Sequence, residues 1–378
     1  MARTINDRLS RLQARRKGMD RLAALDEAVQ QDFVQKSLTQ ESWEKRALDQ
    51  PNTRYALGAM QAVGTDYTAK SIETAMKVGA HFANGACNRI VDCRMQGSVP
   101  LDVHIRGISD VDLLVLDRSF FTYERGGLRD LLGGYRNPTI ETSPGVLSAL
   151  RSGAEALLNR RYWGATVDCS GGKCISLSGA SLARTVDVVP AHWHDTQSYQ
   201  QGNGDHHRGV TIYNKHTNTP IDNLPFLHIH EVGSRDATVA GSLKKAIRLV
   251  KTVKSDAQDE ARAAKLPSFD IAGLLYHADR DALSEGAYAE LAILGEAQRF
   301  IAWCCENPAL AKTLLTPDKS RFILDTNDKM VGLNAINEEL TDLLVRVAEE
   351  QNFLAGLAGL DATTARRIAK AARVPAAA

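Results

Sequence analysis

One short segment constrains the fold of this chain more than any other. In SDVDLLVLD, residues 109–117, two aspartates stand one residue apart at the start of an apolar run. The run predicts a core strand, and side chains at positions i and i+2 of a strand point to the same face, so Asp110 and Asp112 are expected to project together. A buried carboxylate is costly unless something neutralises it. The pair therefore marks either a turn with a solvent-facing aspartate or the ligands of a cation.

The patterns on either side predict an α+β chain with helices at both ends. Residues 5 to about 50 and 65 to 89 have helical periodicity, and the chain after Gly241 is helical to about residue 373. The N-terminal stretch is basic and favours a helix packed on the core or an arm that faces a partner. Its apolar stripe consists of Leu9, Leu12, Met19, Leu22 and Leu25.

The centre of the chain is predicted to be rich in strands. The segment before Gly97 is extended, and residues 103–117 suggest a strand or a hairpin that turns at residues 107–109. Three further strands and a hairpin with a polar turn are expected after the next helical region. Their sequences are ATVDCS, KCISLSG, LARTVDVVPAHW and, for the hairpin, VTIYNKHTNTPIDN.

Composition narrows the class of protein. A formal net charge of +1 provides no global basic field, so no stable binding of nucleic acid is expected. No apolar stretch approaches the roughly 20 residues that cross a bilayer, and the basic N-terminus lacks the apolar segment of a signal peptide. The six cysteines do not form two CxxC-like pairs, which favours reduced thiols in a cytoplasmic protein with no membrane association.

Two features favour the cation site over the simple turn. QGS, residues 96–98, precedes the aspartates, and a Gly-Ser turn lets the backbone and the Ser98 hydroxyl approach a phosphate. RTVDVVPA places Asp187 in a second apolar strand. Three carboxylates in one α+β unit match the needs of two Mg²⁺ ions, for which Mn²⁺ could substitute. Asp110 and Asp112 would bridge both ions, and Asp187 would polarise or deprotonate the attacking hydroxyl.

QGS, SDVDLLVL and VDVVPA together resemble the DNA polymerase β-like nucleotidyltransferase superfamily. Within it the chain is most similar to the CD-NTases of CBASS antiphage defence, the bacterial relatives of cyclic GMP-AMP synthase. RLVKTVK followed by LPSFDIAGLL extends the resemblance into the helical half. The resemblance implies a nucleotidyltransferase core with a mixed β-sheet, flanked by N-terminal helices and a helical C-terminal domain, with the active site between two lobes. The corresponding division is 1–60, 61–235 and 236–378.

The resemblance also implies which residues bind nucleotide. Gln96, Gly97 and Ser98 would contact the phosphates, and Lys251 and Ser268 would hold the donor triphosphate. Val253 stands where family members often have an aromatic residue. Independently of the family, Lys244, Arg248 and Lys251 share one helix face, which is either a solvated stripe or a phosphate-binding surface.

The predicted activity is the joining of ribonucleoside triphosphates into a cyclic di- or trinucleotide second messenger, with release of pyrophosphate. The expected partners are the NTP substrates, an effector protein that responds to the product, and an activating protein. Two alternatives stay open at this point. The chain could transfer a nucleotidyl group to RNA, protein or a small molecule, or it could be a nucleotide sensor that has lost catalysis.

Overall fold

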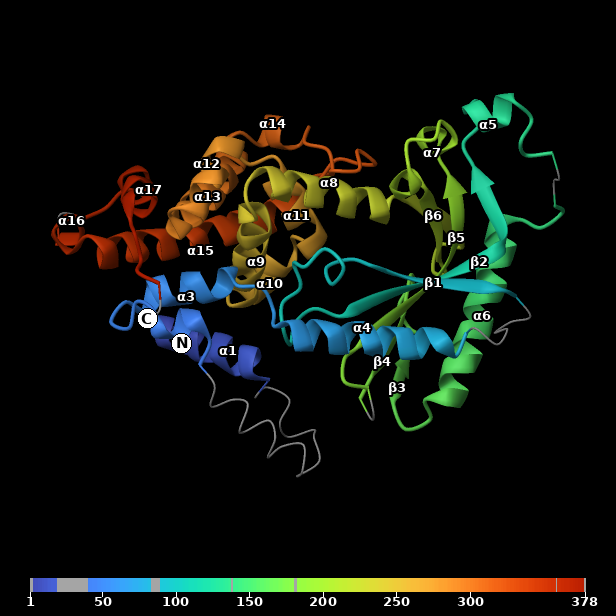
Figure 1. Ribbon diagram of the computed structural model, residues 1–378, viewed down its shortest axis with the longest axis horizontal. Coiled ribbons are helices and arrows are strands. Elements are labelled where there is room, and N and C mark those ends of the chain that lie inside the picture. The colour runs from blue at the N-terminus through green and yellow to red at the C-terminus, as the bar shows by residue number, and fades with distance from the viewer. Residues whose placement is uncertain are drawn as a thin grey trace. The chain divides into compact units, whose positions relative to one another are not determined.

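The computed structural model describes residues 3–18, 40–82, 89–136, 139–179, 182–357 and 359–376, which form two compact units (Figure 1). The sheet unit consists of Gly64–Leu101 and Ser109–Glu231. The helical unit consists of Met1–Val63, Asp102–Ile108 and Val232–Ala378. The predicted positions Met19, Leu22 and Leu25 lie outside the described residues.

The sheet unit is built on a mixed sheet of seven strands in the described residues. The strands are β1 Val91–Gln96, β2 Val111–Tyr123, β3 Thr166–Asp168, β4 Ile175–Ser178, β5 Val186–Asp195, β6 Gly209–Asn214 and β7 Thr219–Asn223. Their order is β1-β2-β5-β4-β3, with β6 paired to β5 and β7 paired to β6. Only the β2–β5 pair is parallel among them. The apolar runs of β2 and β5 suit these central positions, because both faces of a central strand are covered along most of its length.

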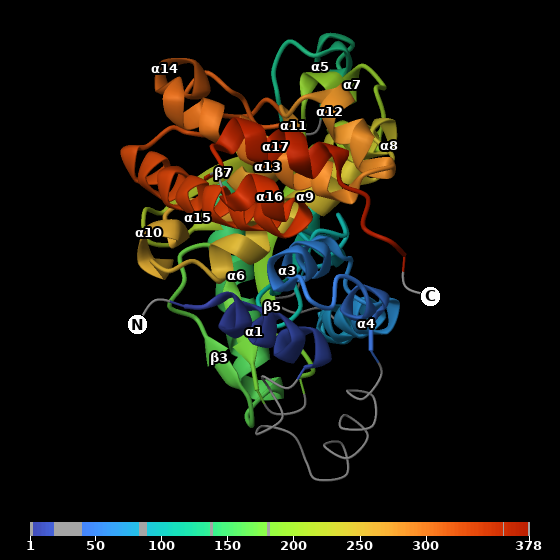
Figure 2. The same ribbon diagram turned by 90° about the vertical axis from the view of Figure 1, so that its left-hand side faces the viewer.

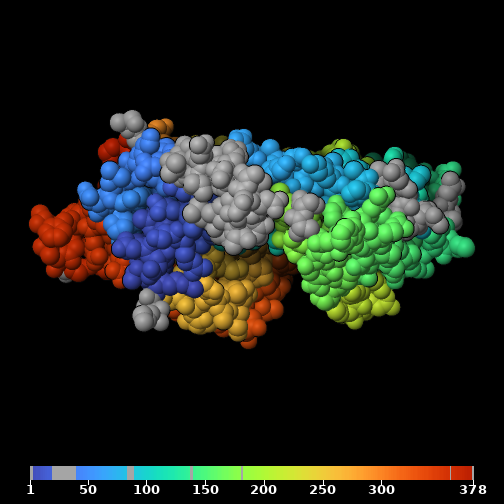
Figure 3. Space-filling view, turned by 90° about the horizontal axis from the view of Figure 1, so that it is seen from below, coloured from blue at the N-terminus to red at the C-terminus, as the bar shows by residue number. Residues whose placement is uncertain are grey.

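The two faces of this sheet have different neighbours. Alternate residues of β1, β2, β4 and β5 form one core with helices α4, Thr65–Ala80, and α6, Ser143–Arg161. In the space-filling view from below, light blue and green surfaces, the colours of α4 and α6, cover this side of the sheet unit (Figure 3). On the opposite face a smaller core of Leu114, Leu116, Val189 and Ala191 packs on the β6–β7 hairpin. The first residues of β2 and β5 precede the positions that form this smaller core, which begins at Leu114 and Val189.

The segment between the QGS turn and the aspartates is not the hairpin that its sequence suggested. Residues 103–109 form no strand, and β2 pairs with β1 and β5 instead. Asp102–Ile108 packs within the helical unit, with Val103, His104 and Ile105 buried there. The prediction was wrong because the main-chain carbonyls of this segment find hydrogen-bond donors on a helix distant in sequence.

The remaining helices of the sheet unit are short. They are α5 Leu128–Leu131 and α7 Gln197–Gln200, with a 3-10 turn at Asp205–His207, and α8 Pro225–Thr238 continues from this unit into the next. The predicted helix over 65–89 ends at Ala80 within the described residues.

Other helices of the helical unit pack around α9, which is buried along most of its length (Figure 2). The helices of this unit are α1 Ile5–Lys17, α3 Pro51–Met60, α9 Ser242–Ser255, α10 Glu260–Ala264, α11 Ser268–Tyr276, α12 Arg280–Ser284, α13 Glu290–Glu306, α14 Pro308–Ala311, α15 Asn327–Gln351, α16 Phe353–Leu357 and α17 Ala362–Ala371, with 3-10 turns at Ser42–Lys45 and Glu285–Ala287. Pro51 is the first residue of α3, where its fixed φ and missing N–H are tolerated. None of the helices in the described residues has the length and apolarity that a membrane span requires.

Candidate active site

A row of polar side chains crosses the sheet at the start of β2. The strand register pairs Gln96 of β1 with Asp112, Asp112 with Asp187 of β5, and Asp187 with Ser176 of β4. Residues that are directly opposite on neighbouring strands point to the same face. The four side chains therefore lie side by side on the face that α4 and α6 leave uncovered. Asp112 and Asp187 are both partly buried, two residues before the apolar positions of each strand begin on this face, at Leu114 and Val189.

The turn after β1 lies directly against one of these carboxylates. Gly97 has a φ of +78°, and a Cβ at this position would stand 2.2 Å from Oδ2 of Asp112. Only glycine satisfies both the left-handed backbone and this close approach. Ser98 follows in the same turn and is partly buried. The QGS turn and the second aspartate of SDVD are thus parts of one packed arrangement.

The donor chemistry of this row suits a hard cation. Two carboxylates on adjacent strands repel each other, and Mg²⁺ prefers such oxygen ligands. Asp110 is exposed and precedes the first residue of β2 by one position. In the described part of the chain, no three Asp, Glu, His or Cys side chains stand together closely enough to hold a metal. Asp112 and Asp187 are paired across neighbouring strands, and Asp110 lies two residues before Asp112, outside β2.

A thiol that the sequence did not single out lies beside this pair. Cys174 immediately precedes β4 and packs against the smaller core on the carboxylate face. Burial, followed by the negative charge of Asp187, raises the pKa of the Cys174 thiol to about 11, and Asp112 and a side-chain hydrogen bond with Asp187 add to the effect. The signal in the sequence was the position of Cys174 two residues before Ser176 on the same strand face, but the pairing of β4 with β5 was needed to recognise it.

The predicted cationic face of α9 lies in the helical unit and is occupied by main chain. Lys251 donates from Nζ to the carbonyl of Val103 at 2.7 Å. Arg248 donates to the carbonyls of Met60 at 2.8 Å and Asp102 at 2.7 Å. Both cations are about 6% exposed. Neither of the two alternatives, a solvated stripe or an open phosphate surface, describes Arg248 and Lys251 in this structure.

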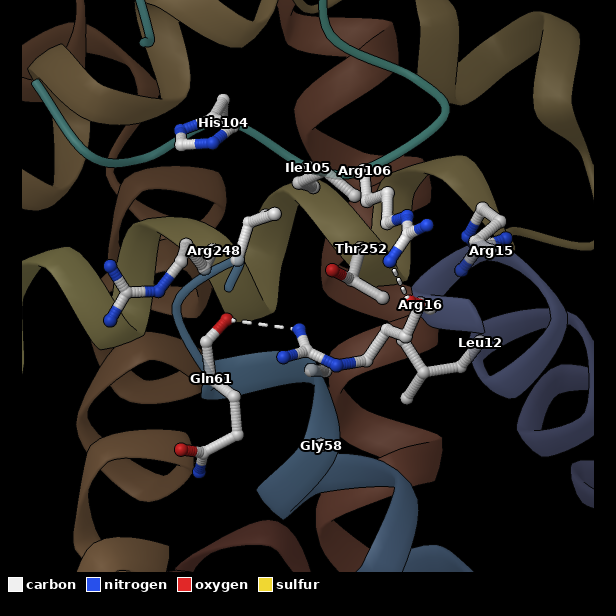
Figure 4. Close-up of a pocket in the computed structure, with 12 residues that line it drawn as sticks. Leu12, Arg15, Arg16, Gly58, Gln61, His104, Ile105, Arg106, Arg248 and Thr252 are labelled. Carbon is white, nitrogen blue, oxygen red and sulfur yellow. Dashed lines mark hydrogen bonds between the residues drawn. The ribbon is translucent and has the colours of Figure 1, made fainter. Parts of the chain in front are cut away.

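A small cavity beside this face has a strongly basic lining (Figure 4). Arg16 donates to the carbonyls of Gln61 and Ala62, and Arg106 donates to the carbonyl of Arg16. The cavity volume of about 10 Å³ is the room of one water molecule. This basic cluster ties segments of the helical unit together and has no space for a nucleotide.

The structure brings some of the predicted residues together and separates others. Gln96, Gly97, Asp112 and Asp187 share one face of the sheet, with Ser98 and Asp110 next to them in the chain. Lys251 and Ser268 belong to the helical unit, where Ser268 is the exposed first residue of α11.

Both the sequence and the structure of this chain are similar to those of known proteins. Residues 231–343 match the C-terminal helical domain of cGAS/DncV-like nucleotidyltransferases. The chain is 37% identical over 354 residues to a cyclic dinucleotide synthase CdnE of Yersinia aleksiciae, covering 91% of this chain and 92% of that protein. The STING-associated CdnE c-di-GMP synthase of Capnocytophaga granulosa is similar in structure, with a TM-score of 0.66, 25% identity, and coverage of 90% and 97% of the two chains. The enzyme of the same description from Flavobacteriaceae sp. has a TM-score of 0.67 at 24% identity, over 80% of this chain and 88% of that one.

Proposed function

This chain belongs to the cGAS/DncV-like nucleotidyltransferases, the CD-NTases, and on that premise we propose that it joins ribonucleoside triphosphates into a cyclic dinucleotide with release of pyrophosphate. The product would act as a second messenger on an effector protein in antiphage defence, and an activating protein would control the enzyme. The 37% identity to a cyclic dinucleotide synthase over nearly the whole chain supports this class of product.

The observation that carries the proposal is the pairing of Asp112 with Asp187 on the parallel strands β2 and β5. Two carboxylates from different strands meet on a face that the neighbouring core leaves uncovered, and a glycine turn lies against one of them. Neighbouring carboxylate oxygens are the ligands that a divalent cation prefers. Nucleotidyl transfer uses such cations, because they neutralise negative charge on the triphosphate and on the attacking hydroxyl as it loses its proton.

Each residue of the row has a distinct proposed role. Asp112 and Asp187, with Asp110 beside them, would hold Mg²⁺, or Mn²⁺ in its place. When two such ions are bound, they neutralise charge on the transferred phosphoryl group and lower the pKa of the attacking hydroxyl. Asp187 would accept the proton of that hydroxyl. The backbone of Gly97 and the backbone and hydroxyl of Ser98 would orient the donor triphosphate, because a glycine turn permits close approach of a phosphate.

Three further residues are proposed to contact the nucleotide. Gln96 lies beside Asp112 in the row and would contact the donor nucleotide from β1. Ser268 is exposed at the start of α11 and is available to a phosphate. Lys251 would serve the nucleotide only if its hydrogen bond to Val103 were exchanged for one to phosphate. The division of the chain at residues 60 and 235 is likewise a proposal.

Incubation of the full chain with all four NTPs and Mg²⁺, without any other acceptor, tests the proposal. We expect a product that resists phosphatase and whose mass in mass spectrometry is that of a cyclic dinucleotide. Single and paired NTPs then identify the bases. Labelling of RNA or protein with no cyclic product would instead favour a transferase for another acceptor. Binding of NTPs without turnover under any condition would favour the sensor.

A further inference from the structure

The loop that joins β3 to β4 is held by one buried arginine. Arg151 of α6 is about 3% exposed, and its guanidinium donates to carbonyls of four residues in the loop Cys169–Cys174. The donor–acceptor distances are 2.8 Å to Gly171, 3.0 Å to Cys174, 3.2 Å to Cys169 and 3.3 Å to Gly172. Glu155 receives the remaining Nε–H at 2.7 Å. A planar guanidinium with five donors suits such a set of acceptors, whereas an ammonium cannot reach them together.

The turn between β6 and β7 fixes the same loop from another direction. The backbone N–H of Lys215 donates to the carbonyl of Gly172 at 3.0 Å, and the ammonium of Lys215 donates to the carbonyl of Cys169. His216 contacts the carbonyl of Ser170 at 3.0 Å. A Cβ on Gly172 would stand 2.5 Å from the His216 ring and 2.7 Å from Oδ1 of Asn214. An irregular loop with so many specific contacts is held in one conformation.

The last residue of this loop carries the thiol beside the candidate site. Asp187 pairs with Ser176, and Cys174 lies two positions earlier in the chain, so the two side chains are expected on the carboxylate face. The packing of Cys174 against the smaller core confirms that placement for the thiol. In an antiparallel pair, the residue two positions from the one directly opposite is a diagonal neighbour within reach of a side chain, so the pairing of Ser176 with Asp187 brings Cys174 near Asp187.

We propose that Cys174 and Arg151 are positioning residues for Asp187: Arg151 fixes the Cys169–Cys174 loop, and the thiol at its end donates a hydrogen bond that orients the carboxylate toward the metal. This inference rests on the proposed function, in which Asp187 is a metal ligand. Partners that hold a metal ligand in place commonly change metal affinity when they are removed, although they never touch the ion. Neither Cys174 nor Arg151 would contact the substrate.

Cys93 provides a matched control. It is partly buried on β1, burial raises the pKa of its thiol to about 11, and the thiol donates to the carbonyl of Gly79 at 3.7 Å. Cys93 packs in the core on the opposite face of the sheet, with α4 and α6. A Cys93→Ala variant therefore measures what loss of a buried thiol does to the unit without a change beside Asp187.

The test measures Mn²⁺ binding to the full chain by electron paramagnetic resonance, and the Mg²⁺ concentration that half-saturates turnover. We expect Cys174→Ala to weaken Mn²⁺ binding by roughly ten- to a hundredfold, and Cys174→Ser, which keeps a donor, to restore most of it. Arg151→Lys should shift affinity in the same direction as Cys174→Ala. Cys93→Ala should bind Mn²⁺ as the wild type does, and Asp187→Asn should lose the site.

The possible outcomes separate the two proposals. If Asp187→Asn abolishes Mn²⁺ binding and Cys174→Ala leaves it unchanged, the positioning role is overturned and the metal site stands. If Cys174→Ala and Cys93→Ala lower the melting temperature alike and neither alters Mn²⁺ affinity, the thiol is only a packing group. If Asp187→Asn binds Mn²⁺ as well as the wild type does, or the wild type binds none, the metal site and this inference fail together.

Discussion

The sheet unit and the helical unit place charged side chains in their interiors in different ways. In the helical unit, Arg248 and Lys251 are almost fully buried, and each donates to main-chain carbonyls of a distant segment. In the sheet unit, Asp112 and Asp187 are partly buried and stand beside each other with like charge. The first arrangement stabilises the fold, whereas the second presents neighbouring carboxylate oxygens to a cation.

The comparison gives a physical criterion for a functional charge. A buried cation that donates to main-chain carbonyls supplies hydrogen bonds that those carbonyls would otherwise lack. Its removal should lower stability first and activity only as a consequence. Removal of a carboxylate that holds a metal ion should have the opposite order of effects, with turnover lost first. Four substitutions can break or sharpen this contrast.

The largest effect is expected for Asp112→Asn. Loss of a ligand removes several kcal/mol of charge stabilisation in the transition state, which corresponds to a loss of turnover of roughly a thousandfold or more. This loss of turnover should be measured at a temperature where the melting curve shows that the variant is fully folded. Asp92→Asn on β1 is the control, since Asp92 is a carboxylate of the same sheet that pairs with Arg94. Equal turnover by the wild type and Asp112→Asn, measured as pyrophosphate release, would contradict the metal assignment.

Gly97→Ala should reduce turnover by about a hundredfold, since displacement of a catalytic group by 1 Å can have this effect. The added methyl would stand 2.2 Å from Oδ2 of Asp112 and must move it. Gly179→Ala is a matched control, because Gly179 has a φ of +80° and open space around its missing Cβ. Both variants should lose about 1–2 kcal/mol of stability from left-handed backbone strain. If turnover falls equally in both, the contact with Asp112 is irrelevant and only the strain matters.

Lys251→Met addresses the other side of the contrast. The free energy of unfolding should fall by about 1.5–3 kcal/mol, the usual range for a hydrogen bond to a charged group, as measured by urea denaturation without nucleotide. Lys244→Met should change it by less than about 1 kcal/mol, because Lys244 forms only a 3.9 Å partly exposed pair with Asp236. Unchanged stability of Lys251→Met together with a raised KM for NTP would make Lys251 a phosphate ligand, as the family resemblance implies.

The smallest effect is a pH dependence within the helical unit. Tyr55 is fully buried and donates to Asp256 at 2.9 Å; burial and then the charge of Asp256 raise its pKa well above the usual 10.0. The unfolded chain therefore ionises this phenol first, so its contribution is complete below pH 10 and is lost as pH rises above it. The stability difference between wild type and Tyr55→Phe should narrow from pH 9 to pH 11 in urea titrations. A constant difference over this range would contradict the assignment.

Much of the sheet unit was predictable because its signals are local. Apolar runs indicated β2 and β5, and the spacing of Asp110 and Asp112 placed both carboxylates at one end of a strand. The α+β class, the metal-ligand candidates and the family resemblance follow from such patterns. The same local signals misassigned residues 103–108 to a hairpin, because an extended segment does not show in its own sequence which donors will satisfy its carbonyls.

Sequence by itself determined which residues could form strands, which carboxylates would stand at their ends, and where a glycine turn could approach a phosphate, since each depends on the geometry of a few consecutive residues. Tertiary structure decided which of these residues meet. The register of β2 and β5 placed Asp112 beside Asp187, the pairing of β4 added Cys174, and a side chain of α6 fixed the loop that carries this thiol. Pairing between strands and hydrogen bonds to distant carbonyls join positions far apart in the chain, so no local pattern records them.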